Sequence, residues 1–193
     1  MKTWIIVAIV LTLVVGIPSL VAMGTYNSLV GLDVDVDNAW YSGVMVQYQR
    51  RHDLIPRIVN STRMYIEYEK QLLLDITEAR SRWADALSGS SFDEQAESNT
   101  EMDGIMTRFL AVLSVEAYPQ LKADQLVADL IYNLEGTENR VAVARMNYND
   151  AVAKYNGVVR TFPTNFIAGM FGFSQKDYWE AGYGTDSPPD VNY

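Results

Sequence analysis

The chain begins with an almost unbroken apolar run. From Trp4 to Met23 it reads WIIVAIVLTLVVGIPSLVAM, with no charged side chain. Since about 20 apolar residues suffice to cross the ~30 Å hydrocarbon core of a bilayer as a helix, we interpret residues 1–24 as a transmembrane anchor. A cleaved secretory signal is the alternative, because Lys2 precedes the run and the residues around Ala22 would suit a signal peptidase.

After this run, apolar residues recur at spacings of three and four, which is the period of a helix that buries one face. The first such face consists of Leu29, Leu32, Val36, Ala39, Trp40, Gly43 and Val46. The sequence Asp53-Leu54-Ile55-Pro56 follows. Proline disrupts a helix interior but suits a first turn, so we predict that one helix ends there and another begins at Pro56. A continuous, kinked helix is the alternative.

Further helices are predicted downstream. Apolar residues at helical spacing run from Ile58 to Leu87 and stop at the loop-like sequence SGSSFD of residues 88–93. A third helix is predicted from Asn99 to Tyr118, and a fourth from about Ala123 to Phe162. The predicted fold is all-α: an N-terminal single transmembrane helix followed by an antiparallel four-helix bundle with long helices, formed by residues 25–162.

The stretch GLDVDVDNAW, residues 31–40, places a carboxylate at every second position. A calcium loop that begins in this way needs Gly sixth and Glu twelfth, but Asn38 and Val44 stand there. The alternation is also too short to override the longer helical period. We therefore predict a helix that carries Asp33 and Asp37 together on a solvated face.

The segment FPTNFIAGMFGF, residues 162–173, is uncharged and aromatic. Its candidate contact residues for a membrane or a partner are Phe162, Phe166, Ile167, Met170, Phe171 and Phe173. It is too short to span a bilayer. It either folds back to cap the bundle, lies in the membrane interface or contacts another subunit. If a break at Pro56 gives four antiparallel helices, the segment returns to the lipid surface. With the acidic tail from Ser174, which we expect to be mobile, it forms the region 163–193.

Charge narrows the choice of partners. Lys2 is the only charge before the apolar run and the next basic residue is Arg50, so the positive-inside rule predicts a cytoplasmic N-terminus and an exported remainder. That remainder carries 14 basic and 24 acidic side chains. Such a balance argues against nucleic acid and anionic headgroups as general partners, although small basic patches can act locally. The chain has no cysteine, hence no disulfide or thiolate chemistry.

Candidate catalytic and metal-binding residues are few. His52 is the only histidine, and its place beside Asp53 at the predicted helix junction favours a surface position over catalysis. Helical bundles can hold two metal ions through Glu-x-x-His pairs. No Glu lies three residues before His52, so the sequence excludes a site of this kind. The carboxylates of Glu135 and Glu138 have the spacing of an ordinary solvated face. We therefore predict no catalytic residue, cofactor or metal.

The polar block Glu135–Arg140 contains a mid-helix glycine. Gly136 costs a helix interior about 1 kcal/mol relative to alanine, so close packing there is expected. We predict a helix–helix contact at Gly136, with Arg140 and Arg145 pairing acids of adjacent helices. A ligand or partner site is the alternative.

Several blocks occur in order along the chain: YNSLV (26–30), VDNAW (36–40), QRR (49–51), DLIP (53–56), TEAR (77–80), VEAYP (115–119), LKA (121–123), LEGTENRVAVAR (134–145), YN (148–149 and 155–156), FPTN (162–165) and FGF (171–173). Together they resemble the LemA family of bacterial single-pass membrane proteins. The resemblance implies a four-helix bundle behind an N-terminal membrane helix and no known reaction. Two places depart from the family pattern: the acidic alternation at Asp33 and Asp35, and the sequence DQLV of residues 124–127.

These observations predict a non-enzymatic, membrane-anchored helical scaffold or interaction protein in the cytoplasmic membrane of a bacterium, with the bulk of the chain extracytoplasmic. Its expected partners are the lipid bilayer and further copies of itself in a homo-oligomer. The alternative is an accessory binding module that presents or regulates another membrane protein, such as a protease or transporter.

Overall fold

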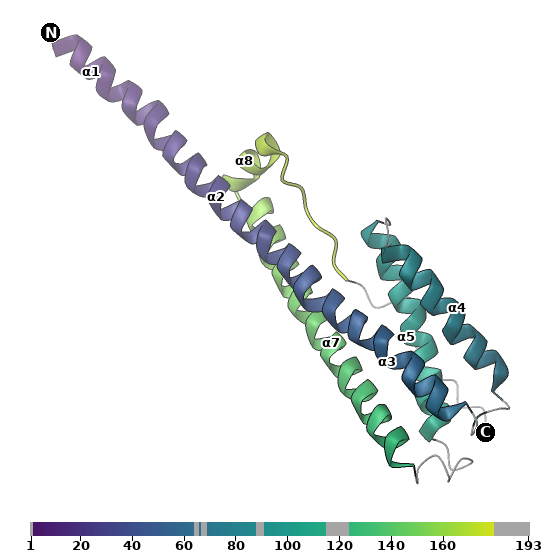
Figure 1. Cartoon of the computed structure of the whole chain (residues 1–193). Helices are drawn as coiled ribbons and strands as arrows, with labels where there is room; N and C mark the ends of the chain where they lie inside the picture. The colour runs from purple at the N-terminus through teal and green to yellow at the C-terminus, as the bar shows by residue number, and fades with distance from the viewer. Residues whose placement is uncertain (1, 64–65, 67–68, 88–90, 115–123, 180–193) are drawn as a thin grey trace, which may run out of the picture. The chain divides into compact units, whose positions relative to one another are not determined.

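The computed structural model describes residues 2–63, 66, 69–87, 91–114 and 124–179. Within these ranges every regular element is a helix (Figure 1). The all-α class predicted from the sequence is confirmed, including a long apolar N-terminal helix followed by packed helices.

The N-terminal helix is unbroken from Lys2 to Thr62. It consists of α1 (Lys2–Leu11), the π-helical turn η1 (Thr12–Gly16), α2 (Ile17–Asn38), the π-helical turn η2 (Ala39–Val44) and α3 (Met45–Thr62). Its apolar first part is unburied, and by length and composition it qualifies to cross a membrane. A signal sequence would pass the same test.

The predicted helix break at Pro56 is wrong. Pro56 lies inside α3, which continues to Thr62. Proline removes one backbone hydrogen bond there, but Ile55 and Ile58 on either side are fully buried, and this packing holds the helix together. The alternative of a helix continuous through Pro56 is what forms, although it stops well before Leu87.

The next helices are α4 (Lys70–Leu87) and α5 (Phe92–Ser114), which pack against each other. α5 begins earlier than the predicted Asn99 because Ser91 and Glu94 form a capping box. The Ser91 amide donates to Glu94 Oε2 (3.1 Å), and the Glu94 amide donates to Ser91 Oγ (3.4 Å). The predicted end of this helix at Tyr118 lies outside the described residues.

The long helix α7 (Gln125–Arg160) agrees with the predicted fourth helix to within two residues at each end. Asp124 caps it, since its carboxylate accepts the amides of Leu126 (3.0 Å) and Val127 (3.3 Å). The aromatic segment then forms a further short helix, α8 (Thr164–Phe171). Gly172 ends α8 in the left-handed conformation (φ 80°), which glycine adopts without strain.

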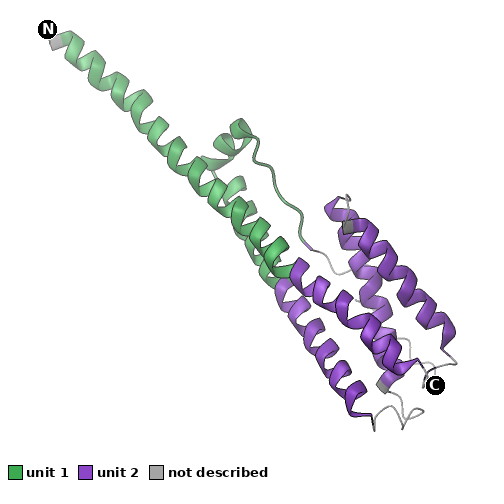
Figure 2. Cartoon of the chain, in the orientation of Figure 1, with its two compact units in different colours: residues 1–44, 145–178 green, residues 45–144, 179–193 purple. Residues whose placement is uncertain are grey.

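The chain divides into two compact units (Figure 2). Unit 1 comprises residues 1–44 and 145–178, and unit 2 comprises residues 45–144 and 179–193. The predicted division at residues 24 and 162 concerns the membrane and the tail, and it stays a prediction. Residues 180–193 of the predicted mobile tail lie outside the described residues.

In unit 1, α2 and the second part of α7 lie side by side in opposite directions. Trp40 packs on Tyr148 with ring centroids 5.2 Å apart, while Tyr26, earlier in α2, meets Phe171 beyond the end of α7. In unit 2, apolar side chains from α3, α4, α5 and α7 share one core. Its members are Ile55, Ile58, Ile66, Leu72, Ile76, Ala79, Met102, Ile105, Met106, Phe109, Leu113, Val127 and Leu134.

Candidate functional site

The aromatic segment presents an exposed apolar ridge. The side chains of Phe162, Phe166 and Met170, four residues apart, are 75%, 67% and 76% exposed. The rings of Phe162 and Phe166 meet edge to face, with centroids 5.9 Å apart. Ala168 is fully buried and Ile167 is partly buried. One side of α8 therefore faces the rest of unit 1, and the other side faces away from it.

Two further aromatic residues fasten α8 to α2 within unit 1 (Figure 1). The Tyr26 ring lies 4.9 Å from the Phe171 ring and 5.7 Å from the Phe173 ring, both edge-on. Such aromatic pairs contribute about 0.5–1.5 kcal/mol each beyond their buried area. Tyr26 follows the apolar run by three residues, so the ridge lies where that run ends.

A polar contact holds the extended segment after α8, residues 174–178, which we call the strap. Lys176 Nζ lies 2.8 Å from a carboxylate oxygen of Asp33 and 2.8 Å from one of Asp37. The Asn156 side chain donates to the Lys176 carbonyl (2.8 Å) and accepts the Lys176 amide (2.9 Å). Asp33 and Asp37 do share one helix face as predicted, but they bind Lys176 instead of standing only in solvent.

The surroundings of Lys176 and Tyr148 raise the pKa values of both side chains. Burial lowers the pKa of Lys176, but its hydrogen bonds to Asp33 and Asp37 outweigh that effect, so the pKa is raised. The Tyr148 hydroxyl donates to the Asp177 carbonyl (2.9 Å), and burial raises the pKa of Tyr148 to about 12. The strap is thus held by groups that are protonated at neutral pH.

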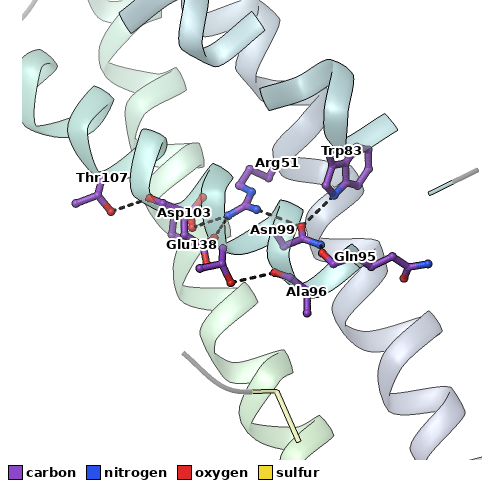
Figure 3. A network of polar contacts seen from close by, with 9 residues as sticks. Arg51, Trp83, Gln95, Ala96, Asn99, Asp103, Thr107 and Glu138 are labelled. Carbon is purple, nitrogen blue, oxygen red and sulfur yellow. Dashed lines mark hydrogen bonds and ion pairs between the residues drawn. The ribbon is translucent and has the colours of Figure 1, made fainter. Parts of the chain in front are cut away.

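Unit 2 contains a fully buried arginine that the sequence analysis did not single out (Figure 3). Arg51 Nη1 on α3 donates to Asp103 on α5 (2.5 Å) and to Glu138 on α7 (3.3 Å). Its guanidinium also lies 5.0 Å above the centroid of the Tyr48 ring. One cation therefore links three helices.

Asn99 extends this arginine network. Its Oδ1 accepts Arg51 Nη2 (3.4 Å) and Trp83 Nε1 (2.9 Å), and its Nδ2 donates to the Gln95 carbonyl (2.7 Å). Every polar atom of this buried amide side chain thus has a partner, as buried amides require. The contact with Trp83 adds α4 to the three helices that Arg51 joins.

The predicted position of His52 at a helix end is wrong. His52 lies inside α3, and its ring stacks on Trp83 with centroids 4.6 Å apart. Burial lowers its pKa, and the positive charge of Arg80 lowers it further. Among the described residues, no group of three His, Cys, Asp or Glu side chains gathers as metal ligands would.

Within the described part of the chain, Gly136 does not make the expected contact with another helix. Among the described residues, the only atoms within 4 Å of a Cβ placed on Gly136 belong to Arg140 of the same helix. Arg140 Nη2 donates to the Thr137 hydroxyl (2.8 Å), so this exposed arginine folds back over the glycine. Arg145, which lies nine residues after Gly136 in α7, is partly buried. Glu138, expected on a solvated face, instead accepts from Arg51.

Comparison with known proteins gives one family. A model described as the LemA family matches residues 40–193. The chain is similar to Magnetosome protein MamQ 2 of Paramagnetospirillum magneticum, with 25% identity over 186 residues that cover 84% of this chain and 67% of the relative. It is also similar to Protein LemA of Metamycoplasma hominis, with 28% identity over 158 residues (81% and 69% covered). Magnetosome protein MamQ of Magnetospirillum gryphiswaldense is 24% identical over 206 residues (92% and 75% covered).

Neutralising one acid of the arginine network should destabilise unit 2. Asp103→Asn leaves the charge of Arg51 buried with one carboxylate instead of two, and hydrogen bonds to charged groups contribute about 1.5–3 kcal/mol. We expect the free energy of unfolding to fall by that amount in denaturant titrations followed by circular dichroism. Glu101→Gln, on the same helix but in the exposed pair with Arg82, is the matched control and should change little. Equal losses in the two variants would contradict a structural role for the network.

Removing the Lys176 charge should release the strap. A nitroxide on Ser174→Cys reports strap mobility, because the chain has no other cysteine. Lys176→Met should narrow its resonance lines, whereas Lys154→Met, at an exposed lysine of α7, should not. Since the folded-state pKa of Lys176 lies above 10.5, its contribution is complete below pH 10.5 and is lost as the pH rises through the higher value. Tyr148 shifts in the same direction. Lines that stay as broad in Lys176→Met as with the native side chain would refute this account.

Proposed function

The chain belongs to the LemA family, and from this premise we propose that it is a non-enzymatic helical scaffold or interaction protein of the bacterial cell envelope. In this proposal the N-terminal apolar helix is retained as a membrane anchor. The rest of the chain lies outside the cytoplasm, where it assembles with further copies of itself. The names of these relatives state no reaction, and the proposal assigns none.

The observation that carries the membrane part of this proposal is the position of the apolar ridge. Phe162, Phe166 and Met170 are exposed on α8, and α8 is fastened to Tyr26 just beyond the apolar run. Aromatic side chains are enriched at the depth of lipid headgroups. With the anchor in a bilayer, the ridge would lie at the membrane surface and bury its apolar area there.

A stripe of exposed apolar residues along α2 supports assembly. Met23, Val30 and Val34 are all exposed, and their spacings of seven and four residues put them on one side of the helix. The stripe continues directly from the apolar run, because α1, α2 and α3 form one helix. Anchors that pack side by side in a membrane would bring these stripes together outside it.

A second candidate function is an accessory module that binds another membrane protein. The observation that favours it is an exposed apolar face on the part of α7 that belongs to unit 2, formed by Tyr132 and Val143. A spacing of eleven residues, about three helical turns, places these side chains on the same side of the helix. Exposed apolar patches of this kind mark contact surfaces for other proteins.

The ridge should enter the lipid surface. We expect a nitroxide on Phe166→Cys, in the full chain reconstituted in phosphatidylcholine vesicles, to be accessible to oxygen and shielded from a water-soluble nickel complex. The label should report headgroup depth because its neighbours Phe162 and Met170 partition there. Tyr132→Cys, equally exposed but on α7, is the control and should report water. Equal nickel accessibility at both positions would rule out the membrane contact.

The full chain should be a homo-oligomer. Light scattering in mild non-ionic detergent should give a protein mass that is a multiple of 21.7 kDa. Val34→Glu places a charge in the α2 stripe and should lower that mass toward one chain, because a buried unpaired carboxylate opposes association. Leu126→Glu, at an exposed apolar residue of α7, is the matched control.

A native chain that is monomeric at working concentrations would end the assembly proposal. Crosslinking in cells would then decide for the accessory module, which requires a second protein in a fixed ratio to this chain. Loss of that protein on changing Val143 to Glu, with α8 intact, would assign it to the α7 face.

A further inference from the structure

A groove of about 730 Å³ lies within unit 2, between the second half of α3 and the first half of α4. Part of its lining is apolar and includes Val59, Leu73 and Leu74. The rest includes three basic residues, Arg63, Lys70 and Arg80. The groove shares no residue with the apolar ridge, the strap or the arginine network.

The charge of this groove runs against the composition of the chain. The protein has 24 acidic and 15 basic side chains, so a basic residue has many carboxylates to pair with. Arg51, Arg82, Arg108 and Lys176 do pair with them. Over the described ranges, no carboxylate lines the groove or pairs with its three basic residues.

Arg80 supplies a second, independent indication. Its Nε is buried, and no hydrogen-bond acceptor reaches it within the described part of the chain. Buried donors of this kind are nearly always satisfied in folded proteins, by the protein itself, by water or by a ligand. The charge of Arg80 is also close enough to His52 to lower the pKa of that residue.

Basic and apolar side chains line the same groove, and we propose that this groove binds a small molecule with a phosphate group and a short apolar chain. Arg63 and Arg80 bind the phosphate, because guanidinium groups match phosphate oxygens in two parallel hydrogen bonds, and Lys70 adds positive charge to the same groove. The positive end of the α4 dipole at Lys70 adds to their attraction. Val59, Leu73 and Leu74 cover the apolar chain.

Hexyl phosphate is a suitable probe, because it combines both features and is soluble in water. We expect calorimetric titration of the full chain, held in phosphatidylcholine nanodiscs, to show one hexyl phosphate per chain. Its affinity should exceed that of inorganic phosphate at least tenfold, since several methylene groups leave water. Hexyl glucoside, which has the chain without the charge, should not bind measurably.

Three variants locate the site. Arg80→Gln should weaken hexyl phosphate binding about tenfold, and Lys70→Gln, at an exposed position where folding is safe, several-fold. Leu74→Ser should bring hexyl phosphate close to inorganic phosphate. Arg57→Gln is the matched control, because Arg57 is exposed on α3 and does not line the groove.

Three outcomes would overturn the proposal: no saturable binding of hexyl phosphate, equal weakening by Arg57→Gln, or equal binding of hexyl glucoside. Residues 180–193 could compete with an external ligand for the groove, because they carry Glu180, Asp186 and Asp190 and no basic side chain. Deletion of these residues tests that alternative. Unchanged affinity after deletion supports an external ligand. A strong gain in affinity would assign the groove to the chain's own acids and refute the external ligand.

Discussion

The burial of one guanidinium group places a strict condition on the packing of unit 2. Arg51 has almost no exposed surface, and a buried cation without partners would cost several kcal/mol. The side chains of Asp103, Glu138 and Asn99 must therefore all lie next to this guanidinium group. Asp103 and Asn99 come from α5, and Glu138 comes from α7. Apolar side chains tolerate a shift along a helix, but this set of hydrogen bonds does not. The network thus selects the register in which the apolar core closes.

The helical class follows from the sequence because it depends on periodicity, and the apolar N-terminal helix follows from the length of its apolar run. Helix ends depend on local chemistry instead. Pro56 suggested a break, yet Ile55 and Ile58 hold α3 together through their burial, which no local rule contains. The start of α5 at Phe92 was readable in principle, since Ser91 and Glu94 have capping-box spacing. That signal was hidden inside a segment whose composition resembles a loop.

The candidate sites also differ in how far the sequence predicts them. The aromatic segment was predictable, because six apolar residues without a charge exceed what a turn requires. The partners of Arg51 were not, since Asp103 and Glu138 are 52 and 87 residues away in the chain. Its burial did leave a trace: Tyr48, Arg51, Ile55, Ile58 and Thr62 follow one another at spacings of three and four, which puts the arginine on the buried face. The Lys176 contact, 139 residues from Asp37, left no such trace.

The helix from Thr3 to Thr62 has a mechanical consequence. Within unit 1 it is helical from Lys2 through Val44, a length of roughly 65 Å. A lipid bilayer that is thinner or thicker than the apolar run would tilt or rotate that run to match its thickness. A continuous helix transmits such a rotation along its axis, so Val34 and Asp37 would turn with the apolar run. Lipid thickness would then act on this protein as a mechanical input.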